Sequence, residues 1–131
     1  KFSYRHSVLE DRFAIVVSVD FTLEHKSAED IRERMKELMG KRSASQPLDK
    51  PSAGSAFKRP SAGYAAALID QAGLKGFQVG GAAISTKHAG FAVNMGGATA
   101  SDVKRVIEAV SEKVFLETSI RLEPEVEFIG R

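Results

Sequence analysis

Cysteine and tryptophan are absent from this chain of 131 residues, and no run of about 18 apolar residues occurs. The lack of cysteine excludes a disulfide framework, a thiolate zinc site and a cysteine nucleophile. The lack of a long apolar run predicts that no segment spans a membrane. The formal net charge is only +2, which argues against nucleic-acid binding by bulk electrostatics. The composition of the chain, with 43% apolar and 27% charged residues, is typical of one soluble globular domain.

Two common site motifs are missing as well. A phosphate-binding P-loop ends in Gly-Lys-Ser/Thr, and no such ending follows Gly54. A nucleophile elbow requires G-x-S-x-G, whereas Gly54 directly precedes Ser55 and Phe57 stands at the second glycine position. Ser55 is therefore not expected to be a hydrolase nucleophile. The three scattered histidines lack metal-ligand spacing, so no metal site is predicted.

The segment P-S-A-G-S-A-F-K-R-P, residues 51–60, is the most informative part of the sequence. Proline restricts the backbone at each end, while Gly54 permits angles closed to other residues. The pattern predicts a rigid, positively charged loop that presents the Ser55 hydroxyl and backbone N–H groups to an anion. The residues alone leave a second interpretation open, which is a tight surface turn with a solvated Lys-Arg pair.

Hydrophobic periodicity and capping patterns predict three helices. The first begins at the capping box of residues 27–30 and should end at Gly40. The second runs from about 61 to 72. The third begins at the capping box of residues 99–102 and places valine and isoleucine on one face. Residues 41–60, between the first two helices, are predicted to be a polar linker and loop.

Strands are expected before, between and after these helices. Residues 13–23 are rich in β-branched and aromatic side chains and predict one long, largely buried strand. Residues 73–97 predict short strands with tight glycine turns, and residues 126–129 predict a last strand. Because regular βαβ alternation is missing, the fold class is predicted to be α+β. Its sheet would consist of mostly antiparallel strands covered by about three helices.

Several separated motifs together resemble the C-terminal part of the UDP-N-acetylenolpyruvoylglucosamine reductase (MurB) family. In chain order they are Tyr4-Arg5-x-Ser7 and the segments 51–60, 68–76, 80–94 and 122–130. Their order over essentially the whole chain is far more specific than any single motif. The resemblance implies that residues 1–11 are the remnant of a preceding FAD-binding domain and that residues 12–131 form a substrate-binding domain. Because the chain begins without methionine, we expect a fragment of a longer protein.

The resemblance also implies an activity, which is that of a cytoplasmic flavoprotein of peptidoglycan precursor synthesis. The family uses FAD to carry a hydride from NADPH to the enolpyruvyl ether of a UDP-sugar, giving UDP-N-acetylmuramate. FAD is expected to bind mainly to the missing N-terminal domain, so no residue here is assigned to it. This chain alone is expected to be inactive. The expected partner is the UDP-sugar, with no nucleic acid, membrane or obligate protein partner.

Three residues match catalytic positions of the family: Ser55 as proton donor, Arg5 and Glu125. A serine hydroxyl is a very weak acid, so the negative charge that develops beside it must be stabilised. The guanidinium of Arg5 suits this role because it is always charged and binds a carboxylate in two places. Glu125 beside the same carboxylate could take up a proton and donate a hydrogen bond. From the residues alone, Arg5 and Glu125 are more simply explained as solvated surface side chains.

Cations for the UDP part are expected from Arg42, Lys58 and Arg59, with Gly54 bringing backbone close to the ligand. Many family members carry a lysine where Ser45 stands here, so one expected phosphate contact is missing. His88 and Asn94 could shape turns or touch the ligand. The alternative function is a stand-alone nucleotide-sugar or phosphate-binding module without catalysis. A small RNA-binding domain is disfavoured by the near-neutral charge.

Overall fold

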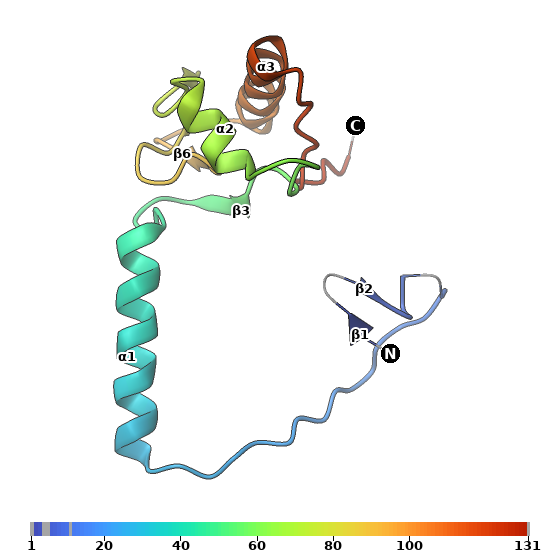
Figure 1. Ribbon diagram of the computed structural model, residues 1–131, viewed down its shortest axis with the longest axis vertical. Helices are drawn as coiled ribbons and strands as arrows, with labels where there is room; N and C mark the ends of the chain where they lie inside the picture. The colour runs from blue at the N-terminus through green and yellow to red at the C-terminus, as the bar shows by residue number, and fades with distance from the viewer. Residues whose placement is uncertain (1, 4–5, 11, 131) are drawn as a thin grey trace. The chain divides into compact units, whose positions relative to one another are not determined.

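The computed structural model describes residues 2–3, 6–10 and 12–130. Contacts between residues divide the chain into two compact units, Lys1–Glu33 and Arg34–Arg131. In the first unit, β1 (Phe2–Ser3) and β2 (His6–Ser7) pair antiparallel, with Phe2 opposite Ser7. The other elements of Figure 1 are α1, which crosses the division between the units, and the sheet and helices of the second unit.

Residues 12–27 form neither a helix nor a strand, so the long strand predicted over residues 13–23 is wrong. Its apolar side chains are exposed, including Phe13, Ile15 and Phe21. A strand becomes stable only when its N–H and C=O groups bond to a neighbouring strand. No described segment pairs with residues 13–23, so their β propensity is not realised.

Helix α1 spans Ala28–Ser45 and starts where the capping signal predicts. The Ser27 hydroxyl accepts a hydrogen bond from the Asp30 N–H at 3.1 Å. The helix does not end at Gly40 but continues to Ser45, because a single glycine costs only about 1 kcal/mol within a helix. None of its residues is buried, and Ile31 and Met35 are exposed.

The second unit contains a four-stranded antiparallel sheet in the order β3-β6-β5-β4. The strands are β3 (Ser52–Ser55), β4 (Gln78–Val79), β5 (Ala82–Ile84) and β6 (Phe91–Asn94). The short strands and turns predicted over residues 73–97 are therefore confirmed. The loop predicted over residues 41–60 is only partly right, because β3 pairs with β6 as an edge strand. Its register shifts between Ser52 and Ser55, where Gly54 has a φ of +90°.

Two helices pack around this sheet: α2 (Ala65–Gln71), which is shorter than predicted, and α3 (Ala100–Thr118). The α3 face predicted from periodicity is confirmed, since Val106, Ile107, Val110 and Val114 are buried. Helices α2 and α3 contact each other, and α3 contacts β4, β5 and β6 (Figure 1). The α+β class, the antiparallel sheet and the three helices are confirmed. The cover comes from α2 and α3, because α1 buries no residue.

Residues 126–129 are not a strand, which corrects the last predicted element. Pairing stops at an isolated bridge between Phe57 and Pro124. Beyond it Phe128 is half exposed and Ile129 is almost fully exposed. In the part of the chain that the structure describes, no helix combines the length and apolarity needed to cross a bilayer.

Candidate functional site

Two segments that are far apart in the sequence, 55–58 and 122–125, lie side by side in the second unit. The N–H of Glu125 donates to the carbonyl of Ala56 at 3.0 Å, and the N–H of Lys58 donates to the carbonyl of Glu123 at 2.9 Å. The bridge between Phe57 and Pro124 lies between these two bonds. We call this pairing of residues 55–58 with residues 122–125 the terminal ladder. It places Ser55 one residue from a direct backbone bond to Glu125.

Ser55 ends β3 and its side chain is exposed. Its hydroxyl donates a hydrogen bond to the Phe57 carbonyl at 3.1 Å. The following residues, Ala56 and Phe57, are buried in the core and anchor the segment. Glu125 is exposed as well. Both groups are therefore accessible to a ligand on the surface of a fixed backbone.

Gly54 directly precedes Ser55, and its backbone conformation favours a glycine at this position. Its φ of +90° is a conformation that L side chains rarely adopt. A Cβ placed on Gly54 would meet no heavy atom of the described structure within 4 Å. The backbone beside Ser55 is thus open to a close approach. Arg5, the third predicted catalytic residue, lies outside the described residues, so its position relative to Ser55 stays a prediction.

The three cations predicted to contact the phosphates of the ligand, Arg42, Lys58 and Arg59, each contact another side chain of the chain. Lys58 forms an ion pair with Glu123 across the terminal ladder, and this carboxylate raises the pKa of Lys58 above its ordinary value. The guanidinium of Arg59 lies 4.4 Å from the centre of the Tyr64 ring. The Arg42 side chain donates to the Gln46 side chain at 3.1 Å. None of the three lines the pocket described next.

A cavity of about 550 Å³ lies against the sheet face opposite α3. The strand register explains which side chains point to each face of the sheet. Ala82 and Ile84 pack in the core with α3, whereas Ala83 lies opposite Gln78 and Val93 and points to the other face. The sheet-face pocket, as we call this cavity, is lined by Ser43, Pro47, Leu48, Asp49, Lys50, Gly76, Gln78, Ala83, Ile84, Ser85, Thr86, Lys87, Val93 and Met95.

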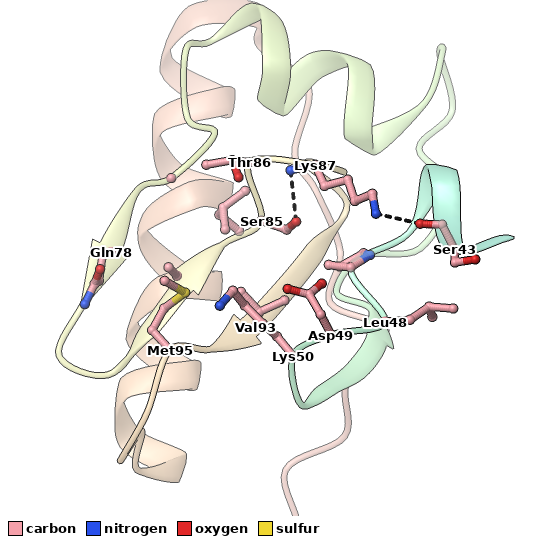
Figure 2. Close-up of a pocket in the computed structure, with 14 residues that line it drawn as sticks. Ser43, Leu48, Asp49, Lys50, Gln78, Ser85, Thr86, Lys87, Val93 and Met95 are labelled. Carbon is pink, nitrogen blue, oxygen red and sulfur yellow. Dashed lines mark hydrogen bonds between the residues drawn. The ribbon is translucent and has the colours of Figure 1, made fainter. Parts of the chain in front are cut away.

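Two walls of the sheet-face pocket carry its charged groups (Figure 2). Asp49 and Lys50 come from the loop between α1 and β3, and Lys87 comes from the turn between β5 and β6. The ammonium of Lys87 donates to the Ser43 carbonyl at 2.5 Å, which ties this turn to the last residues of α1. Buried Ser85 accepts the N–H of Lys87 at 3.1 Å and fixes the turn.

His88 and Asn94 both shape turns. The Nδ1 atom of His88 accepts the N–H of Gly90 at 3.1 Å, and its ring packs edge-on against Phe91. The Asn94 side chain accepts the N–H groups of Gly96 and Ala98 at 2.8 and 3.1 Å. These contacts support the structural interpretation of both residues.

Sequence reasoning did not place Lys50 or Lys87 in a pocket, although both line this one. Lys87 lies between Thr86 and His88 in a stretch whose signal was its glycines. The available signal was Ser85, because a serine two residues before a lysine can accept that lysine's N–H in a turn. Among the described residues, no three His, Asp or Glu side chains gather in a way that could hold a metal ion.

These features define a class of protein before any comparison: an α+β domain with a charged pocket on one sheet face and a serine and a glutamate on a neighbouring ladder. The family model described as UDP-N-acetylenolpyruvoylglucosamine reductase, C-terminal domain, matches residues 46–129. The chain belongs to this family.

Relatives agree with the family assignment. The chain is 49% identical over 130 residues to UDP-N-acetylenolpyruvoylglucosamine reductase of Latilactobacillus sakei, and 46% identical over 130 residues to that of Caldanaerobacter subterraneus. Each alignment covers 99% of this chain and 43% of the relative. The crystal structure of the Thermus caldophilus reductase (MurB) is similar, with a TM-score of 0.64 and 43% identity over 80% of this chain and 37% of that one. The chain therefore spans less than half the length of these relatives.

Proposed function

We propose that this chain is the substrate-binding C-terminal domain of a flavin-dependent reductase that converts UDP-N-acetylglucosamine enolpyruvate to UDP-N-acetylmuramate. NADPH would be the hydride donor. The family assignment and the names of the relatives support the reaction. The observation that supports the assignment to residues is the terminal ladder, in which Glu125 bonds to Ala56, the residue that follows Ser55.

Hydride addition to C3 of the enolpyruvyl group leaves negative charge that spreads into the carboxylate, and a proton must then reach C2. FAD, bound by the portion of the reductase outside these residues, would supply the hydride. Ser55 would give its proton to C2, since its exposed hydroxyl is held only by a neutral carbonyl acceptor. Glu125 would hold the substrate carboxylate by a hydrogen bond when protonated.

Substitution of Ser55 in the full-length reductase tests the assignment. We expect Ser55→Ala to slow the step in which reduced flavin is reoxidised by the enolpyruvyl substrate by about 10²- to 10⁴-fold, the usual contribution of a positioned proton donor. Flavin reduction by NADPH should keep its wild-type rate, because that step needs no proton at C2. Stopped-flow absorbance measures the two half-reactions separately.

Ser61→Ala is the matched control, since Ser61 is another exposed hydroxyl just beyond Pro60. It should leave both half-reactions unchanged. A Ser55→Ala enzyme that reoxidises at the wild-type rate would remove Ser55 from the mechanism. A stand-alone nucleotide-sugar-binding module, the alternative function, would give no reason for the terminal ladder to hold Glu125 against Ala56, the residue that follows Ser55.

A further inference from the structure

The ion pair between Lys58 and Glu123 crosses the terminal ladder close to Glu125 and has no part in the chemistry described above. We propose that Glu123 is a positioning residue of the reductase, which holds the Lys58 ammonium and so keeps this cation from pairing with Glu125. Glu125 can then take up the proton that its hydrogen bond to the substrate carboxylate requires. The role of Glu125 rests on the proposed function, whereas the competition for Lys58 rests on the geometry of the ladder.

The register of the terminal ladder puts two carboxylates within reach of Lys58. Lys58 stands opposite Glu123, to whose carbonyl its N–H donates at 2.9 Å. Glu125 stands opposite Ala56, two residues before Lys58, and its N–H donates to the Ala56 carbonyl. Side chains two residues apart in an extended strand lie on the same face. Glu125 is therefore a diagonal neighbour of Lys58, and diagonal neighbours are about 7–8 Å apart, a distance that a long side chain spans.

Lys58 responds to a row of carboxylates on this face. Its pKa is raised above the ordinary value mostly by the hydrogen bond to Glu123, and the charges of Glu125 and Glu127 raise it further. These three glutamates are spaced two residues apart, which is the spacing of side chains on one face of an extended segment. The electrostatics and the register therefore agree that Glu125 is the second carboxylate available to Lys58.

The other charged groups near this part of the ladder are two arginines and two glutamates. The guanidinium groups of Arg59 and Arg121 each lie over an aromatic ring. Glu108 and Glu112 of α3 line a groove together with Glu123. Because both arginines are engaged with rings, Lys58 is the cation that the ladder carboxylates share.

The choice that Lys58 makes between the two carboxylates affects the proton on Glu125. An ammonium beside a carboxylate favours the ionised form of that carboxylate. Without Glu123, the Lys58 side chain would turn to Glu125 and hold it ionised, and an ionised Glu125 would repel the substrate carboxylate. Lys58 and Glu123 are both exposed, and exposed ion pairs contribute little to folding stability. We therefore expect the pair to matter for ionisation and not for folding.

An NMR titration of the 131-residue chain tests the competition without flavin or substrate, with the side-chain carboxyl carbon of Glu125 as the readout. Glu123→Gln should move the titration midpoint of Glu125 to lower pH by about one unit, the lower end of the effect of a neighbouring opposite charge. Lys58→Met should move it to higher pH, because the Glu123 charge is then uncompensated. In the Lys58→Met background, Glu123→Gln should have a much smaller effect. Lys58→Arg keeps the cation and should titrate like the wild type.

The full-length reductase tests the consequence for catalysis. In Glu123→Gln, the rate at which the enolpyruvyl substrate reoxidises the flavin should begin to fall at a lower pH than in the wild type, because protonated Glu125 is the active form. Flavin reduction by NADPH should keep its wild-type pH profile, since that step does not involve Glu125. Glu117→Gln is the matched control, because it removes an exposed carboxylate of α3, and it should leave both profiles unchanged. Amide spectra of the same variants in the 131-residue chain show whether the ladder is intact.

The outcomes separate this inference from the proposed function. An unchanged Glu125 titration in Glu123→Gln, or an equal shift with and without Lys58, would overturn the competition for the cation. A shifted titration together with an unshifted reoxidation profile would remove Glu123 from the reductase mechanism. Lysine-dependent titration of Glu125, combined with wild-type reoxidation in Ser55→Ala, would count against the proposed role of Ser55 and leave the competition standing.

Discussion

At the scale of single residues, the Asp102 carboxylate is held by backbone N–H groups and a guanidinium. Its carboxylate accepts the Thr99 N–H at 3.0 Å, contacts the Arg105 guanidinium at 2.5 Å and receives the Gly81 N–H at 3.4 Å. These contacts lower the pKa of Asp102 to about 2, and the hydrogen bonds with Thr99 contribute most to the shift. Gly80 must be a glycine because a Cβ there would lie 2.4 Å from this carboxylate.

Asp102→Asn is expected to lower the melting temperature at neutral pH. The ionised carboxylate is the form that the folded state stabilises, so its contribution is complete above the ordinary pKa of about 4. It is lost as pH falls from about 4 through the folded value of about 2. The difference in melting temperature between wild type and variant should therefore shrink over this range. A difference that stays constant between pH 7 and pH 2 would contradict the assignment.

At the scale of elements, α3 is the helix on which the second unit is built. Its N-terminus has a complete capping box between Thr99 and Asp102, and Ser119 ends it in a left-handed conformation with a φ of 59°. Ser111 in its middle donates to the Leu122 carbonyl at 2.7 Å. This bond brings the chain back toward the terminal ladder. The helix thus supports both the sheet beneath the pocket and the segment that carries Glu125.

Ile107→Ala should destabilise the second unit strongly, because Ile107 is 1% exposed in the core beside Val106 and Val110. Removing a buried isoleucine to alanine costs about 2–5 kcal/mol of unfolding free energy through lost burial and the cavity left behind. For a unit of this size the melting temperature should fall by roughly 4–8 °C for each kcal/mol. Thermal unfolding followed by circular dichroism measures this fall.

Leu116→Ala provides the matched control on the same helix, since Leu116 is 75% exposed. Its effect should stay within about 0.5 kcal/mol. If both substitutions had equal effects, α3 would not bury the face that its periodicity predicts.

At the scale of the whole chain, the two units differ in how much apolar surface they bury. The core residues all belong to the second unit, Arg34–Arg131. Residues 12–27 instead expose Phe13, Ile15, Phe21 and Leu23. Local stability follows burial and hydrogen bonding, so the two units should differ in resistance to proteolysis.

Chymotrypsin digestion of the 131-residue chain should cut first after Phe13, Phe21 or Leu23. A product that starts within residues 14–28 should persist for at least about ten times longer, because Phe57, Phe77 and Phe91 are buried or partly buried. Mass spectrometry of timed samples identifies the cuts. The same digestion in urea is the control, and there the cuts should no longer occur in this order. First cuts between residues 77 and 115 would contradict the division into units.

The candidate site was predictable only in part. The residues and the family resemblance picked out Ser55, Gly54 and Glu125, and the structure brings the segments of Ser55 and Glu125 together. Which residues line the sheet-face pocket was not predictable, because Lys50, Gln78 and Lys87 meet there only through strand order and register. Lys58 and Arg59 carry the right charge, yet their contacts with Glu123 and Tyr64 appear only in three dimensions.

Sequence by itself determined the start and buried face of α3, the start of α1, the glycine turns of residues 73–97 and the α+β class. These features depend on neighbours one to four residues apart, and local hydrogen bonds and periodicity specify them. Only the tertiary structure decided that residues 13–23 and 126–129 form no strand and that residues 52–55 form one. A strand exists only where a distant segment supplies the opposite row of hydrogen bonds, and no local pattern contains that partner.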